Sequence, residues 1–304
     1  MGNIDLNNKH KTLHLKYKEK YRQVEEKEGN CYPGIRQAIW LLVLIFLLQT
    51  ALVILAGILG SVVDFPLTEH PVTIGVINLI AIGLVLMLGL KKTNAPFKEV
   101  FPLSTIQMSL LFPMSLTVIG MGILISEIDN LFRTVLPMPT WISDLFMNLL
   151  GHWSSIILLV IIAPLTEEPL FRGLILRGFL GRYTVRKAVL VSAILFGLLH
   201  FNPWQFIGAV ILGVLFAWWF VQTGSLLPCL FGHALHNAVP LILMGIFHLE
   251  IQGLTSATTA VEFQPLWLDL VGLLLTWLGM WLLIRMFRET ETTPSEDSFR
   301  TQSQ

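Results

Sequence analysis

Eight long apolar segments restrict what this 304-residue chain can fold into more than any other feature of its sequence. They lie at residues 38–63, 72–90, 108–125, 154–180, 187–200, 203–221, 225–247 and 265–286. A helix of about 20 residues crosses the roughly 30 Å hydrocarbon core of a bilayer, and most of these segments reach that length. Because backbone polar groups find no partners in lipid, continuous apolar runs of this kind form helices there. We therefore expect an all-α, polytopic membrane bundle of about eight transmembrane helices.

The composition excludes a soluble enzyme. Hydrophobic residues make up 54% of the chain and charged residues only 13%, whereas about a quarter of the residues in a soluble domain are charged. The two cysteines, Cys31 and Cys229, lie far apart in different settings. Neither a disulfide framework nor a thiolate metal site is therefore expected.

The basic residues predict how the bundle is oriented. With the N-terminus in the cytoplasm and eight alternating spans, every Lys and Arg except Arg133 falls on the cytoplasmic side. Both termini are then cytoplasmic, as a basic tail at 1–36 and a disordered tail at 288–304 that flank an eight-helix domain at 37–287. Within this domain we expect residues 95–107 to lie in the cytoplasmic interface and residues 127–153 to form an amphipathic external cap.

Five polar side chains lie inside the apolar segments, where their free-energy cost suggests a functional site. They are Glu167, Glu168, His200, His233 and Asn237. Counted from the predicted cytoplasmic helix ends, Glu167, His200, His233 and Asn237 lie about 12–20 Å deep. Since three helices carry polar groups to similar depths, we expect these groups to meet in one cavity that opens to the cytoplasmic side.

Helical spacing separates the two glutamates. Glu168 precedes Arg172 by four residues, the favourable order for an ion pair, and we interpret this pair as structural. Glu167 points about 100° away from Glu168 around the helix, so the two are not expected to point at one spot. Glu167 has no such partner and is therefore the freer carboxylate.

The residue types suggest hydrolysis by activated water. A buried carboxylate beside a neutral imidazole can take a proton from water. His233 and Asn237 share one helical face, close to His236, and their N–H groups can donate to a developing oxyanion. The sequence contains neither a His-Glu-x-x-His zinc motif nor a Gly-x-Ser-x-Gly nucleophile elbow.

Three ordered motifs on successive helices resemble the CPBP family of intramembrane endopeptidases, which includes the CAAX prenyl proteases and bacterial self-immunity-type relatives. The motifs are Glu167-Glu168-x-x-x-Arg172, Phe196-x-x-x-His200 and His233-x-x-x-Asn237, within about residues 150–240. The resemblance implies a metal-independent, glutamate-type protease in which Glu167 and His200 activate water. It further implies that His233 and Asn237 hold the oxyanion, with Glu168, Arg172, Phe196 and His236 in supporting positions.

On this interpretation the chain is a multi-pass protein of the inner or plasma membrane and needs no cofactor. Its partners are the lipid bilayer and a membrane-associated peptide or protein, lipidated or not, and no nucleic acid. One alternative is a zinc metalloprotease with Glu167, His200 and His233 as ligands. Others are a transporter or proton relay, and an immunity protein that binds a membrane partner without catalysis.

Overall fold

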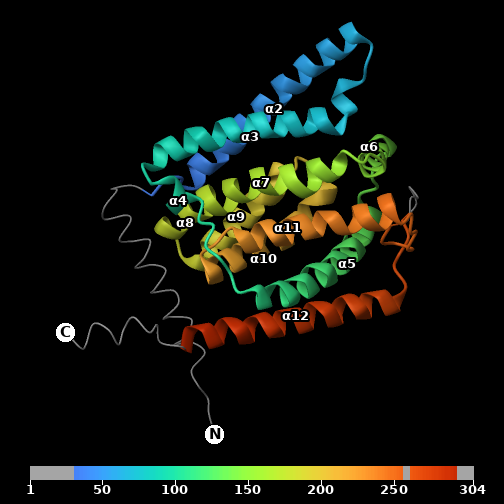
Figure 1. Cartoon of the computed structure of the whole chain (residues 1–304). Helices are drawn as coiled ribbons and strands as arrows, with labels where there is room; N and C mark the ends of the chain where they lie inside the picture. The colour runs from blue at the N-terminus through green and yellow to red at the C-terminus, as the bar shows by residue number, and fades with distance from the viewer. Residues whose placement is uncertain (1–30, 256–260, 293–304) are drawn as a thin grey trace, which may run out of the picture.

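The computed structural model describes residues 31–255 and 261–292, and every regular element in these ranges is a helix (Figure 1). The first half contains α2 (Ile35–Val63), η1 (Leu67–Glu69), α3 (Pro71–Thr93), α4 (Phe97–Val100), η2 (Met108–Leu110), α5 (Leu111–Val135) and α6 (Thr140–Gly151). The second half contains η3 (Ile157–Ile162), α7 (Ala163–Glu168), η4 (Pro169–Leu176), α8 (Arg177–Arg182), α9 (Val185–Leu199), α10 (Pro203–Thr223), α11 (Leu227–Pro240), η5 (Leu241–Ile246) and α12 (Leu266–Thr292). The predicted all-α, multi-pass fold is confirmed.

Among the described residues, six helices are long and apolar enough to span a membrane: α2, α3, η2 with α5, α10, α11 with η5, and α12. The predicted segment 154–180 corresponds to a continuous helical run that alternates between π and α geometry from η3 to α8. The predicted segment 187–200 corresponds to α9, whose 15 residues extend only about 22 Å. The count of eight spans and the cytoplasmic location of both termini therefore remain predictions.

The segments outside the spans differ in part from expectation. Helix α5 continues through the start of the predicted external cap to Val135, and α6 forms within the rest of that cap. Within the predicted interfacial segment at 95–107, only α4 is helical. Helix α12 continues to Thr292, into the predicted tail at 288–304. Residues 1–30 and 293–304, which make up most of the two predicted tails, lie outside the described residues.

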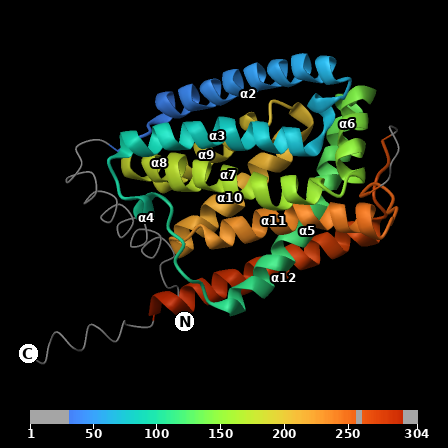
Figure 2. The same cartoon turned by 45° about the horizontal axis from the view of Figure 1, so that its top comes forward.

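The two ends of the bundle differ in charge, and they serve below as reference directions for the site. The axes of helices α3, α11 and α12 are roughly parallel in both views. Helices α4 and α8 lie toward one end of the bundle, and α6 lies at the other (Figures 1 and 2). The α4 end, where α8 ends and α9 begins, is basic and carries Lys91, Lys92, Lys98, Arg182, Arg186 and Lys187. The α6 end, where α5 ends and α10 begins, is acidic.

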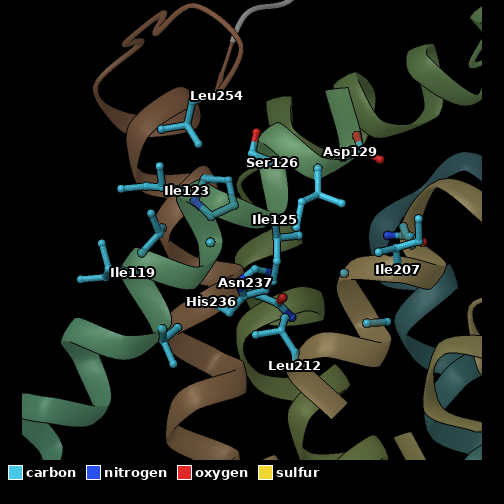
Figure 3. A pocket seen from close by; sticks show the side chains of 18 of the residues that line it. Ile119, Ile123, Ile125, Ser126, Asp129, Ile207, Leu212, His236, Asn237 and Leu254 are labelled. Atoms are coloured by element: carbon cyan, nitrogen blue, oxygen red, sulfur yellow. The ribbon is translucent and has the colours of Figure 1, made fainter. Parts of the chain in front are cut away.

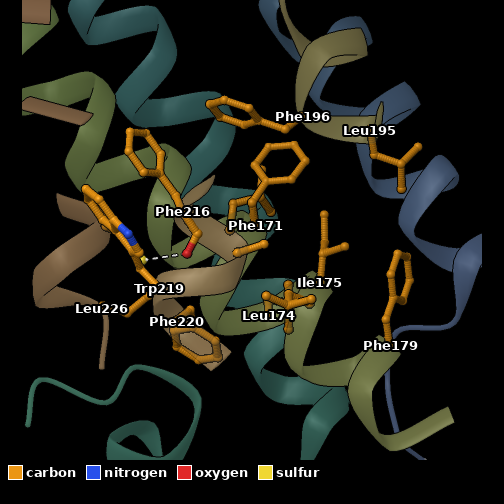
Figure 4. Close-up of a cluster of buried hydrophobic side chains, with 14 of the residues drawn as sticks. Phe171, Leu174, Ile175, Phe179, Leu195, Phe196, Phe216, Trp219, Phe220 and Leu226 are labelled. Carbon is orange, nitrogen blue, oxygen red and sulfur yellow. Dashed lines mark hydrogen bonds between the residues drawn. The ribbon is translucent and has the colours of Figure 1, made fainter. Parts of the chain in front are cut away.

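A dense aromatic core fills the bundle on the α4 side of the polar residues. Phe171, Phe179, Phe216, Trp219 and Phe220 are each at most 1% exposed and pack with Leu174, Ile175 and Leu226 (Figure 4). These side chains come from η4, α8, α10 and the start of α11. Burial of this many large side chains holds the four helices of the motif region in fixed relative positions.

Helix α12 packs closely against α5. A Cβ atom on Gly120 would lie 2.6 Å from the backbone nitrogen of Thr276, and one on Gly279 would lie 2.4 Å from the Thr117 hydroxyl. Such small residues let two membrane helices approach each other through their backbones. The opposite face of α5 is turned toward α10 and α11, where it forms one wall of the cavity described below.

Candidate active site

The two glutamates lie on an irregular helix. Helix α7, which carries them, has a π-helical segment on either side and prolines at Pro164 and Pro169. A proline supplies no backbone N–H, so carbonyl groups in the preceding turn lose their usual donors. The Thr166 hydroxyl donates to the carbonyl of Ile162 at 2.8 Å. Single π-helical turns of this kind are frequent at functional sites.

Glu168 is fully buried and is the centre of a charged network. Its Oε1 accepts hydrogen bonds from Arg172 Nη1 at 3.1 Å and from His233 Nδ1 at 2.7 Å. Arg172 also donates to the carbonyl of Gly213 at 3.3 Å, and its guanidinium lies 4.6 Å from the ring centre of Phe196. The predicted ion pair between Glu168 and Arg172 is therefore present, and it holds an imidazole as well.

Glu167 approaches the same imidazole from its other side. Its Oε2 lies 4.0 Å from His233 Nε2, and this oxygen is buried and makes no hydrogen bond with the described residues. The expectation that the two glutamates do not point at one spot is therefore wrong. A 100° rotation along one helix separates the two carboxylates, but His233 lies between them and presents a different ring nitrogen to each.

The network determines which nitrogen of His233 carries a proton. An ionised carboxylate only accepts hydrogen bonds, so Nδ1 donates to Glu168 and Nε2 is the nitrogen directed to Glu167. The rings of Phe196 and Phe216, whose centres lie 5.9 and 6.0 Å from that of His233, pack against the imidazole and restrict its rotation.

The remaining predicted site residues lie on α9 and α11. His200 follows the last residue of α9 and hydrogen-bonds through Nδ1 to the carbonyl of Phe196 at 3.1 Å, which leaves Nε2 free to face outward. Asn237 donates from Nδ2 to the carbonyl of Leu159 in η3 at 2.8 Å, which fixes the orientation of the amide. Glu167 and His200 share no direct hydrogen bond among the described residues, so joint action on a water molecule would have to run through that molecule.

A cavity of about 500 Å³ brings His200, His233, His236 and Asn237 together. Its walls come from α5, α10 and α11 and from residues 251–255, and Figure 3 shows side chains of these elements directed into it. Most lining side chains are apolar, including Ile119, Ile123, Ile207, Leu212 and Leu243. Neither glutamate is part of the wall, and Glu167 adjoins it through its contact with His233.

The cavity extends toward the α6 end of the bundle. Its outer lining residues are Ser126 and Asp129 near the end of α5, Trp204 and Gln205 at the start of α10, and Thr255. Toward the α4 end, Trp219, Phe220 and Cys229 are at most 1% exposed and close the bundle. The expectation of an opening at the basic end, which we predicted to be cytoplasmic, is therefore wrong.

Sequence analysis missed the contribution of α5. A Cβ atom on Gly122 would lie 3.7 Å from His236 Nδ1, which places this part of α5 beside the motif residues of α11. Ser126 and Asp129 follow Gly122 at helical spacing and line the same cavity. This spacing of small and polar residues indicates one polar helix face. The predicted span ends at residue 125 and the predicted cap begins at residue 127, so the prediction placed Asp129 outside the bundle.

The described residues do not form a recognisable metal centre. Within residues 31–255 and 261–292, no three His, Cys, Asp or Glu side chains converge in an arrangement that could hold a metal ion. Glu167 and His233 lie close together, but His200 is not grouped with them as a third ligand. The geometry thus gives no support to the zinc alternative.

Comparison with known families gives a match over the motif region. Residues 149–239 match the family described as type II CAAX prenyl endopeptidase Rce1-like. The resemblance inferred from the three ordered motifs is therefore confirmed over these residues. No curated protein and no solved structure matches the chain.

Proposed function

We propose, on the basis of the Rce1-like match at residues 149–239, that the chain is an intramembrane endopeptidase of the glutamate type. It hydrolyses a peptide bond in a membrane-associated peptide or protein, acts in the inner or plasma membrane, and requires no cofactor. The observation that carries the proposal is the buried Glu167 carboxylate, which has an oxygen without a hydrogen-bond partner 4.0 Å from an imidazole at the cavity wall. Glu168 Oε2 also makes no hydrogen bond with the described residues, but it lies 3.1 Å from Arg172 Nη1 in an ion pair, so Glu167 is the one of the two whose open position suggests a place for a reactant.

In this mechanism Glu167 is the general base. A water molecule bound between its Oε2 and the cavity gives a proton to the carboxylate as it attacks the scissile carbonyl carbon. His200 accepts a second hydrogen bond from this water through Nε2 and orients it, because its Nδ1 is already engaged with Phe196. Glu167 then returns the proton to the leaving amine, which balances the reaction as the addition of one water.

His233 and Asn237 stabilise the developing oxyanion. This role of His233 requires a proton on both ring nitrogens, so that Nδ1–H donates to Glu168 and Nε2–H donates beside the cavity. One amide hydrogen of Asn237 is used by the carbonyl of Leu159, and the second can point to the substrate oxygen. Donors fixed in this way before the reaction require little reorganisation in the transition state.

The test is a hydrolysis assay with purified protein in lipid nanodiscs. Membrane-anchored peptide libraries are incubated in H₂¹⁸O, and new C-termini are identified by mass spectrometry. We expect cleavage by the wild type with one ¹⁸O atom in each new carboxyl group, and loss of at least about 10³-fold in rate for Glu167→Gln. Glu69→Gln, at an exposed position in η1, is the matched control and should retain full activity.

Two results would contradict the proposal. Cleavage by Glu167→Gln at the wild-type rate would remove the general base. Loss of activity on treatment with a chelator, with recovery on addition of zinc, would favour the metalloprotease alternative.

A further inference from the structure

The outer part of the cavity joins an apolar channel to a carboxylate. Between the motif residues and the α6 end, the apolar part of the wall includes Ile123, Ile207, Leu243 and Leu254. At the outer end the Asp129 carboxylate lies on the wall, from the last turns of α5 (Figure 3). A bound peptide would therefore contact apolar surface near the reacting bond and a carboxylate farther out.

Glu127, two residues before Asp129 on α5, is already occupied. Glu127 Oε2 accepts hydrogen bonds from Asn130 Nδ2 at 3.1 Å and from the backbone N–H of Gln264 at 3.0 Å, which attaches the segment after η5 to α5. Glu127 is also absent from the cavity wall. Arg133 follows Asp129 by one turn, farther out along α5, and offsets part of its charge.

The whole α6 end favours a cationic ligand. In the described ranges, its loops and helix ends carry Asp64, Glu69, Glu127, Asp129, Asp144, Glu250 and Glu262, and Arg133 is the one Lys or Arg among them. A field of one sign at the mouth of a low-dielectric cleft raises the local concentration of oppositely charged ligands. The charge of the mouth therefore complements basic peptide side chains.

The helix spacing gives the register of this contact. Gly122 lies level with His236, and Asp129 is seven residues farther along α5, a rise of about 10 Å. An extended peptide advances about 3.3 Å per residue, so this distance corresponds to about three residues.

We propose that the preferred substrate is a peptide with apolar residues at the scissile bond and a Lys or Arg about three residues away, which enters from the α6 end and pairs with Asp129. This inference rests on the proposed function for its definition of the scissile bond. It assigns Asp129 as a residue that determines specificity, and it makes no demand on the chemical step.

The test measures binding separately from cleavage. Fluorescent decapeptides with a central Leu-Leu pair carry Lys, Gln or Glu three residues before or after that pair, or Lys at a terminus as a register control. Their affinities for the full-length Glu167→Gln protein in detergent micelles are measured by fluorescence anisotropy. The substituted residue stands either before or after the Leu-Leu pair. In one of these two positions, we expect the Lys peptide to bind about fivefold more tightly than the Gln peptide, as one partly exposed ion pair would allow.

The preference should disappear when Asp129→Asn is added to the Glu167→Gln protein. It should remain when Glu289→Gln is added instead, because Glu289 is an exposed residue near the C-terminal end of α12 and lies outside the cavity wall. It should also persist with Asp129→Glu and weaken between 50 and 500 mM NaCl. Equal affinities for Lys and Gln peptides, or a preference that survives Asp129→Asn or high salt, would overturn the inference. Selective binding without cleavage by the wild type would instead contradict the proposed function and leave the binding inference intact.

Discussion

Glu167 and Glu168 are adjacent in the sequence, yet the structure predicts opposite consequences for their substitution. Glu168 is 0% exposed, accepts two charge-assisted hydrogen bonds at Oε1 and forms an ion pair with Arg172, whereas Glu167 Oε2 makes no hydrogen bond within the described part of the chain and lies 4.0 Å from His233 Nε2. Glu168→Ala should therefore destabilise the fold strongly. Glu167→Gln should leave stability unchanged and abolish activity.

The magnitude follows from what each change leaves behind. In Glu168→Ala, the Arg172 guanidinium keeps the carbonyl of Gly213 and the ring of Phe196 but loses its only ion-pair partner while 2% exposed. Stranding a buried charge in this way costs about 3–5 kcal/mol of unfolding free energy, which corresponds to a fall of roughly 5–8 °C in Tm for a chain of this size. Glu167→Gln preserves the shape of the side chain and breaks no hydrogen bond at Oε2, so its cost should stay below about 1 kcal/mol.

The assay is thermal unfolding of the purified variants in one detergent, in parallel with peptide cleavage. Glu168→Gln provides an intermediate case, because its amide oxygen can still accept from His233 although the negative charge is lost. A Tm for Glu168→Ala equal to that of the wild type would refute the reasoning about the buried network. A similar loss of Tm for Glu167→Gln would show that Glu167 is a structural residue.

Three further predictions concern the oxyanion site, the loop that attaches to α5 and the direction of access. Asn237→Ala should lower kcat by about 10²–10³-fold with little change in KM, and a rise in KM with kcat unchanged would indicate a role in binding only. Gly253→Ala should lower Tm because Gly253 has φ +69° and an added Cβ would lie 2.7 Å from a backbone nitrogen, whereas Gly83→Ala, with nothing within 4 Å, should not. In a cysteine-free background, Gln205→Cys at the cavity mouth should react with a membrane-impermeant thiol reagent in intact cells. Arg186→Cys should react only in inside-out vesicles. The reverse pattern would contradict the predicted orientation.

The sequence was sufficient to predict the helices. Apolar runs and their polar boundaries depend on local composition, so the predicted segment 203–221 differs from α10 (Pro203–Thr223) only at its end. The ion pair between Glu168 and Arg172 was predictable for the same reason, since residues four apart on a helix are neighbours whatever the tertiary fold. The site residues that follow from helical spacing and motif order were therefore accessible without coordinates.

The sequence was insufficient where helices meet. The position of His233 between two carboxylates depends on how α11 crosses α7, and helical angles within α7 do not contain that information. The role of α5 depends on its close packing with α12, which turns Asp129 toward α10 and α11. The prediction that the cavity opens at the basic end was wrong. The depth of a polar residue along its helix does not tell on which side of the site large aromatic side chains pack and close the bundle.

The two ends of the bundle together limit where a substrate can approach. The α4 side of His233 is filled by Trp219 and Phe220, so a peptide from that side would have to displace core side chains at a cost of several kcal/mol each. The α6 side offers a preformed cavity that ends at Asp129 and is framed by polar groups. If the basic α4 end is cytoplasmic, as the distribution of Lys and Arg predicts, the scissile bond comes from a segment on the other side of the membrane. The orientation of the bundle thus decides which class of substrate can reach Glu167.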